Sequence, residues 1–329
     1  MDIIISDYFS KLNFGEVQSF KNLKIIPIIS KEVEGFVYIT LKEALEKKRM
    51  IVKEVSVAGS VPELKVINES NTSVLLLDGE ELAGAKQNRV LNTTILVKGK
   101  SELVIPVSCT EQRRWHYRTD DFFDSGNILS HKIRGKNVAS VNNSLKYRGN
   151  YMSDQGDIWD GIHEMSIKAG VHSATGAMRD VFEENKDALG EYIKAFNCLS
   201  HQKGIFVFLN GEIAGLDILS RESAFEIIFS KLVKSYAMDA MLEKEGKKEK
   251  KDEKCIEEAK RFIEEIKDCR EKIYPSVGQG KEYRFEGKNK VGTALVYRKK
   301  VIHTAFFKVS EEEKIGRMSG YKRRRGFII

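Results

Sequence analysis

The chain has 329 residues, 41% of them hydrophobic, and a net charge of +7 from 55 basic and 48 acidic side chains. This apolar content excludes an intrinsically disordered chain, and four cysteines and 25 glycines are too few for a disulfide-stapled miniprotein or a fibrous repeat. No apolar run reaches the roughly 18–20 residues of a membrane helix, and the N-terminus lacks the basic start of a signal peptide, so we expect a cytoplasmic protein with no membrane partner.

The first third of the chain alternates short apolar runs with turn residues, which predicts strands. The expected strands lie at 25–29, 36–39, 51–57, 64–67 and 74–77. One helix is expected between 40 and 48, because Thr40 can cap its start and Glu43, three residues on, completes a capping box.

Two further β-rich runs, 90–97 and 102–107, are predicted to form a hairpin around the turn at 98–101, Lys-Gly-Lys-Ser. Pro106 lacks a backbone N–H, which favours an edge strand or a bulge near the end of the second run.

From about residue 153 the pattern becomes helical. Apolar stripes predict helices at 157–169, 175–185, 187–199, 221–243 and 255–273, and strands return at 205–209, 213–219, 294–297 and 301–307. We therefore expect an α+β fold with a β-rich N-terminal half containing hairpins and a C-terminal half of helices and strands. No Pro- or Ser-rich linker separates the halves, so we expect one compact unit.

Polar side chains concentrate in two segments, 78–89 and 108–116, which flank the predicted hairpin. Counting outward from the turn places Arg89 opposite about Thr110, and antiparallel pairing brings both segments to the same end of the hairpin. This placement depends on register, since a slip of one residue turns every side chain to the other face.

The side chains of these segments are of the types that bind nucleotides. Three basic side chains would hold phosphate: Lys86, Arg89 and Arg114. Three amides would hydrogen-bond a polar ring or a ribose: Gln87, Asn88 and Gln112. Trp115 offers a face on which a ring can stack.

The same segments also carry groups with chemical reactivity. Asp78, Glu81 and Glu111 are candidates for general acid or base catalysis or for binding a divalent cation, and the sequence identifies no other cofactor. Cys109 is a candidate nucleophile because basic residues lie near it in sequence, although a cysteine at a strand end is more often a small buried residue.

Long runs of the sequence resemble one known domain family. LLLDGEELAGAKQNRVLNTTILV and IPVSCTEQRRW, followed by the looser SDQGDIWDGI, HSATGAMRDVF, GIFVFLNGEIAGLDIL and KLVKSYAMDAM, resemble the ARG-and-rhodanese-phosphatase-superfamily-associated protein domain, first type. One departure is Arg113, where the family pattern has a glycine before the Arg-Trp pair. The resemblance runs from about Gly15 to Phe307, and we expect one domain over 15–310, β-rich to 150 and mixed from 151, followed by a basic tail at 311–329.

The resemblance implies a link to ADP-ribose or nucleotide metabolism, with functional association to ADP-ribosylglycohydrolase-type proteins, and specifies no reaction. Together with the polar segments, it favours a protein that binds or processes a nucleotide-like small molecule in a cleft between 78–89 and 108–116. The alternative is a non-catalytic structural or protein-interaction module whose polar segments form a buried network. Nucleic-acid binding is disfavoured, because no aromatic-interleaved basic motif accompanies the basic tail.

Overall fold

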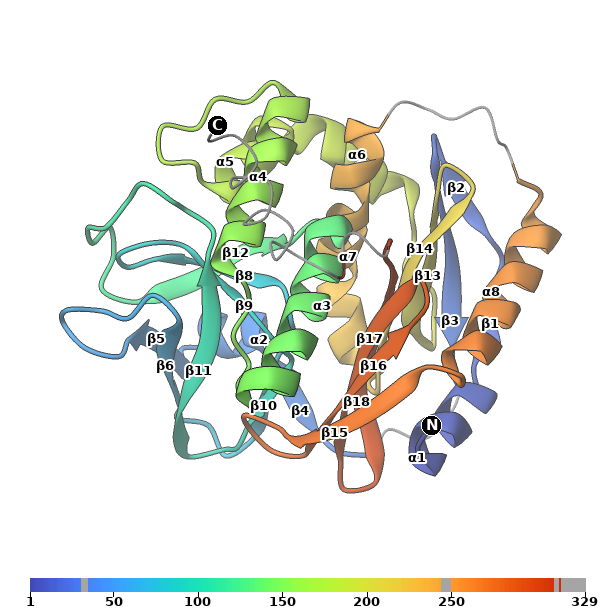
Figure 1. Ribbon diagram of the computed structural model, residues 1–329, viewed down its shortest axis with the longest axis horizontal. Coiled ribbons are helices and arrows are strands. Elements are labelled where there is room, and N and C mark those ends of the chain that lie inside the picture. Colours follow the sequence, from blue (N-terminus) through green and yellow to red (C-terminus); the bar gives the residue numbers. More distant parts are fainter. Residues whose placement is uncertain (31–34, 244–249, 311–313, 315–329) are drawn as a thin grey trace, which may run out of the picture.

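A computed structural model describes residues 1–30, 35–243, 250–310 and 314. Within them, eight helices and eighteen strands form three sheets with helices packed on them (Figure 1). The predicted α+β class is confirmed. The basic tail expected at 311–329 lies outside the described residues, apart from Lys314.

The largest sheet has nine strands and joins the two ends of the chain. Its strands are β1 Asn13–Phe14, β2 Gln18–Phe20, β3 Leu23–Ile29, β13 Gln202–Leu209, β14 Glu212–Leu219, β15 Arg270–Pro275, β16 Lys281–Gly287, β17 Lys290–Tyr297 and β18 Lys300–Lys308. They are ordered β1-β3-β13-β14-β18-β17-β16-β15, and β2 also pairs with β3. Because β3 pairs directly with β13, the two halves of the chain share one sheet and one core.

Two smaller sheets are built from the middle of the N-terminal half. Their strands are β4 Tyr38–Thr40, β5 Met50–Glu54, β6 Glu63–Asn68, β7 Ser73–Leu76, β8 Glu80–Gly84, β9 Arg89–Leu91, β10 Ile95–Val97, β11 Ser101–Cys109 and β12 Phe122–Ile128. One sheet runs β12-β8-β9-β11-β6-β5 and the other β10-β7-β4, in which β4 and β7 are parallel.

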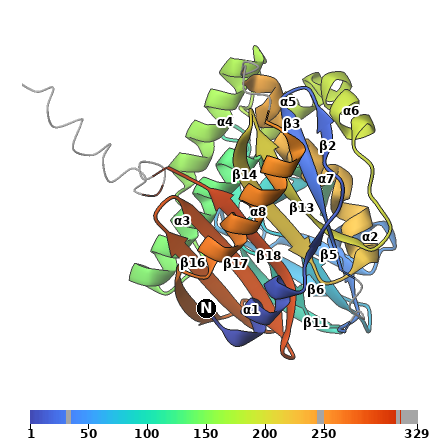
Figure 2. The same ribbon diagram turned by 90° about the vertical axis from the view of Figure 1, so that its right-hand side faces the viewer.

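Helices cover both faces of the nine-stranded sheet. They are α1 Ile3–Ser10, α2 Leu41–Glu46, α3 His131–Arg148, α4 Gln155–Ala169, α5 Met178–Glu184, α6 Lys186–Ala195, α7 Glu222–Leu242 and α8 Asp252–Ile266. Figure 2 shows α1 and α8 on one face, where they pack on Phe206 and Phe208. Ile205 and Val207 alternate with these residues and point to the opposite face, toward α3 and α7. No helix of the described residues has the length and apolar character needed to cross a membrane.

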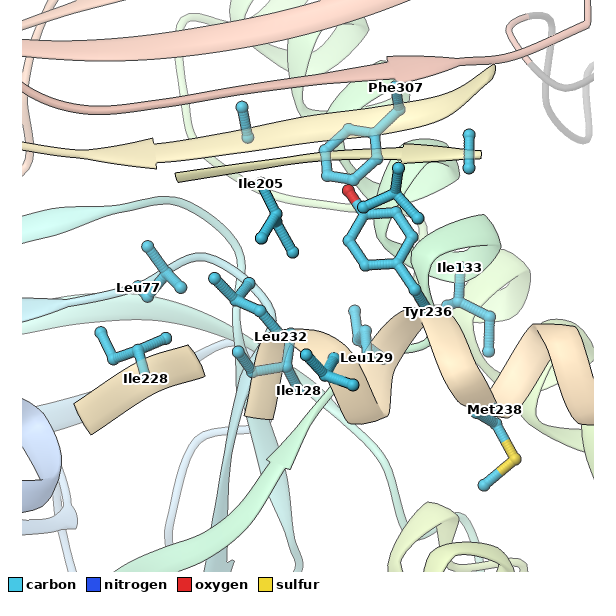
Figure 3. Packing of buried hydrophobic residues seen from close by; sticks show 14 of the residues in the cluster. Leu77, Ile128, Leu129, Ile133, Ile205, Ile228, Leu232, Tyr236, Met238 and Phe307 are labelled. Carbon is cyan, nitrogen blue, oxygen red and sulfur yellow. The ribbon is translucent and has the colours of Figure 1, made fainter. Parts of the chain in front are cut away.

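Helix α7 is the central packing element between the sheets. Leu232 and Tyr236 point toward Ile205 and Phe307 of the nine-stranded sheet, and Ile228 lies near Leu77 at the smaller sheets (Figure 3). All five of these apolar residues and Tyr236 are buried, so this helix joins the large sheet to the region that carries the polar segments.

Most of the predicted elements are present. The expected capping box forms at α2, where Glu43 N donates to Thr40 Oγ1 (3.2 Å) and Thr40 N donates to Glu43 Oε2 (2.9 Å). The helices expected at 157–169, 175–185, 187–199 and 221–243 correspond to α4, α5, α6 and α7.

Two predictions are wrong. The helix expected at 255–273 ends at Ile266, and residues 270–275 instead form β15, which pairs along its whole length with β16. The run 90–97 is not one strand, because the chain leaves the sheet after Leu91 and β10 pairs with β7. Thr93 and Thr94 cause the break: their hydroxyls bond to the buried Glu282 and Asp78.

Candidate functional site

The two polar segments meet at one end of the six-stranded sheet. β8 and β9 are joined by the turn at 85–88, and β9 pairs antiparallel with the end of β11. Arg89 lies opposite Cys109, one residue away from the predicted Thr110. The register differs because the connection from β9 to β11 includes the excursion through β10, which a simple hairpin count omits.

Glu111 and Arg114 form a buried ion pair at the centre of this region. Arg114 Nη2 lies 2.6 Å from Glu111 Oε2, and both side chains are fully buried. Arg114 also donates to the carbonyls of Gly84 (3.1 Å) and Ala85 (2.5 Å), while Thr175 donates to Glu111 Oε1 (2.9 Å). Burial alone would raise the pKa of Glu111, but the hydrogen bonds and charge of Arg114 outweigh it and hold that pKa below its ordinary value.

The amides of Gln87 and Asn88 connect the two segments. Gln87 Nε2 donates to the Glu111 carbonyl (2.9 Å), and its Oε1 accepts from Arg89 Nη1 (2.9 Å). Asn88 Oδ1 accepts from Gly84 N (3.1 Å) and from Arg114 Nη2 (3.2 Å). Both amides therefore satisfy neighbouring protein groups and hold the turn in place.

Arg89 is less completely hydrogen-bonded than Arg114, which lacks a partner at Nε alone among the described residues. The side chain is fully buried, yet Nε and Nη2 have no hydrogen-bond partner among the described residues. Its guanidinium lies over the ring of Trp115, 5.6 Å from the centroid. Burial lowers the pKa of Arg89, with partial compensation from the nearby Cys109 and Glu54. A buried guanidinium with two unmet nitrogens is costly unless an anion completes it.

Lys86 contacts two aromatic side chains, and one of them, Trp115, also lies against Arg89. Lys86 Nζ lies 5.3 Å from the Trp115 ring centroid and 5.2 Å from that of Tyr117, and it donates to the Ala58 carbonyl (2.7 Å). Trp115 is 46% exposed, so one part of the indole faces solvent. Gln112 is exposed nearby in sequence.

Sequence reasoning missed Glu54, which lies at the end of β5. It is buried, and neither of its carboxylate oxygens has a hydrogen-bond partner among the described residues. A Cβ atom on Gly59 would lie 3.3 Å from Glu54 Oε2, from Lys86 Cδ and from Trp115 Cζ2, so these three side chains surround one point. We call Glu54, Lys86, Arg89, Cys109 and Trp115 the Arg89 site.

Cys109 is held in this site as a buried thiol. Its Sγ lies 3.2 Å from the Glu111 carbonyl and accepts from Glu111 N at 3.3 Å. Burial raises the pKa of the thiol despite the nearby charge of Arg89. At neutral pH the residue is therefore protonated, which disfavours nucleophilic attack in this conformation.

Asp78 belongs to a different buried cluster. Arg134 of α3 donates to it twice, from Nε and Nη2, both at 2.9 Å, and Arg134 Nη2 lies 2.7 Å from Asp217 of β14. Thr94 donates to Asp78, and His303 bonds to Thr94 (2.9 Å). Asp78 is thus fully engaged by protein groups and does not face the Arg89 site.

Glu81 also points away from the Arg89 site, toward Thr110 (2.8 Å) and Asn127. It is fully buried and lacks a basic partner within ion-pair distance among the described residues. Burial raises its pKa to about 7, against the lowering effect of the Thr110 hydrogen bond. No three His, Cys, Asp or Glu side chains in the described part of the chain gather so as to hold a metal ion.

Glu81 predicts a pH dependence of stability. Because the pKa of Glu81 is raised on folding, its protonated form stabilises the fold. This contribution to the free energy of unfolding, up to about 3 kcal/mol, is complete below about pH 4.5 and is lost as the pH rises through 7. Glu81→Gln is therefore expected to gain stability relative to the wild type between pH 5 and pH 8. Urea denaturation at four pH values measures this, with the exposed Glu63→Gln as control. A difference between Glu81→Gln and wild type that stays constant with pH would contradict it.

Several open depressions on the described part of the surface lie away from the Arg89 site. One, of about 270 Å³, is lined by residues that include His131 and Lys308, and another, of about 120 Å³, lies between α3, α4 and α7. Their charged residues are mostly paired already, as in His131 with Asp239 (2.6 Å) and Lys308 with Glu212 (2.9 Å). The Arg89 site is the stronger candidate because its four unmet buried atoms belong to two charged side chains, Glu54 and Arg89.

The chain belongs to the family of the ARG and Rhodanese-Phosphatase-superfamily-associated Protein domain, which it matches over residues 11–307. The match includes both polar segments and the Arg89 site. Neither the curated proteins nor the solved structures provided a match.

Proposed function

We propose that this protein binds a small anionic ligand of the nucleotide or ADP-ribose type at the Arg89 site, between segments 78–89 and 108–116. The observation that carries the proposal is the buried guanidinium of Arg89, whose Nε and Nη2 have no partner among the described residues. A phosphate oxygen pair fits this fork, because the guanidinium offers two parallel N–H donors.

The surrounding side chains support the same ligand class. Lys86 adds a second positive charge, and the half-exposed Trp115 provides a stacking face for a base. Arg114, Gln87 and Asn88 act by holding the turn that carries Arg89. Since the unmet atoms are shielded from solvent, Trp115 or the loop at 55–62 must move for a ligand to enter.

The proposal makes a prediction about Arg89→Met. Methionine removes a buried, incompletely paired charge, so the ligand-free variant is expected to melt no lower than the wild type. In the wild type, a ligand at 100 times its dissociation constant adds about 2.7 kcal/mol of stability, and we expect Arg89→Met to lose that gain. Thermal-shift measurements with phosphate, mononucleotides, NAD and ADP-ribose, each with and without Mg²⁺, check both parts.

The exposed Arg113→Met is the matched control, because it removes a neighbouring positive charge outside the site. A wild type that no anion stabilises, together with an Arg89→Met variant that melts far lower, would overturn the proposal.

That outcome would favour a second function, a non-catalytic module that contacts other proteins. The buried Glu111–Arg114 ion pair supports it, because these candidate site residues act as structural groups. The apolar side chains of Val57 and Tyr117, exposed beside the site, would then contribute to a partner surface. In either case we propose functional association with ADP-ribosylglycohydrolase-type proteins, which the family description supports.

A further inference from the structure

The Arg89 site contains two buried groups of opposite charge that do not meet. Both oxygens of Glu54 and two nitrogens of Arg89 lack hydrogen-bond partners among the described residues. The charge of Glu54 acts on Arg89, yet no ion pair within 4.0 Å joins them in this part of the chain. Each group therefore has unmet hydrogen-bonding capacity.

Glu54 lies close to Lys86 and Trp115. Its Oε2 is one of three atoms that would crowd a Cβ on Gly59, and the other two belong to Lys86 and Trp115. The φ of Gly59 is +79°, so the backbone can stay close to the carboxylate only because this residue is glycine. Glu54 is thus held beside the proposed stacking face and beside the second cation.

The charges around Glu54 indicate which type of ligand group can donate hydrogen bonds to its carboxylate. Three cations, Lys86, Arg89 and Arg114, are buried near two carboxylates, Glu54 and Glu111. A positively charged ligand group would increase this excess, whereas neutral hydroxyl groups can satisfy both Glu54 oxygens without adding charge. A carboxylate with two free oxygens matches two neighbouring hydroxyls.

We propose that the ligand presents an anionic group to Arg89 and a pair of neighbouring hydroxyl groups to Glu54, as a ribonucleotide does. This inference rests on the proposed anion site and names the chemical class that fills it. Glu54 is then a specificity-determining residue, which distinguishes ribose from deoxyribose. Phosphate binding itself depends on Arg89 and does not require Glu54.

The test compares AMP, 2′-deoxy-AMP and inorganic phosphate by isothermal titration calorimetry. In the wild type we expect AMP to bind at least about tenfold more tightly than 2′-deoxy-AMP, because the deoxy compound leaves a buried carboxylate oxygen unmet. Glu54→Gln is expected to reduce that ratio to about twofold or less while phosphate still binds. Glu63→Gln, an exposed change of the same type in the next strand, is expected to keep the wild-type ratio.

The outcomes separate the two proposals. If phosphate and both nucleotides bind the wild type with equal affinity, the hydroxyl inference fails and the anion site stands. If none of the three binds, the anion site fails as well. A wild-type ratio near one overturns the inference even if Glu54→Gln does not fold, and a tenfold ratio that Glu54→Gln keeps overturns the assignment to Glu54.

Discussion

Replacing Arg134 with methionine is expected to lower the free energy of unfolding by about 3–5 kcal/mol. Its guanidinium holds Asp78 with two 2.9 Å hydrogen bonds and lies 2.7 Å from Asp217. All three side chains are at most 1% exposed. Without Arg134, two buried carboxylates would remain in one cluster and lose their guanidinium, with the imidazole of His303 3.8 Å from Asp78 and 3.6 Å from Asp217.

The electrostatics of Asp78 supports this expectation. Burial by itself would raise the pKa of Asp78, but the charge and hydrogen bonds of Arg134 reverse the effect and hold the pKa well below its ordinary value. A carboxyl group with a lowered pKa stabilises the fold above its unfolded pKa, and that contribution is lost as the pH falls. In Arg134→Met, Asp78 should therefore contribute less to the loss of folding stability as the pH falls.

Urea denaturation measures the loss, with Arg148→Met at the exposed end of the same helix as control. The triple variant Arg134→Met, Asp78→Asn, Asp217→Asn should recover much of the lost stability, because it removes the uncompensated charges. An Arg134→Met protein with wild-type stability would show that the cluster carries little of the folding energy.

Asp78 also shows where sequence reasoning reached its limit. Its distant partners, Arg134 of α3 and His303 of β18, lie far away in the sequence, and Arg134 is 56 residues from it. No local pattern encodes such a contact, so Asp78 was grouped with the nearby site residues. The convergence of 78–89 with 108–116 was predictable, because it follows from antiparallel pairing of strands close in sequence.

Helix α3 was missed for a related reason. Its buried face includes Arg134, Asn137 and Asn142 among the apolar residues, so the apolar stripe that marks a core-facing helix is interrupted. Gly135 lowers its helix propensity further, and it is tolerated because Phe307 and Val309 pack against that position. Glu54 carried no signal at all: it is a single acidic residue at a strand end, and its importance comes from the unmet oxygens that only the fold reveals.

The second large effect is expected at the Glu111–Arg114 pair. Arg114→Met should cost about 3–5 kcal/mol, because it leaves the Glu111 carboxylate buried without its cation. Glu111→Gln should also be destabilising, and the double variant should lose less than the sum of the two. For groups in one ion pair the coupling energy is expected to reach about 1–3 kcal/mol, measured by a double-mutant cycle in urea.

The contrasting cycle pairs Glu111 with Arg89. These residues form no ion pair with each other among the described residues and are linked indirectly, through Gln87 and through the Asn88 backbone. Their coupling should therefore be small, within about 0.5 kcal/mol. Strong Glu111–Arg114 coupling with weak Glu111–Arg89 coupling would separate a structural arginine from one that is free to bind a ligand. Equal coupling in both cycles would mean that Arg89 belongs to the same buried network, and the case for an anion at that guanidinium would be lost.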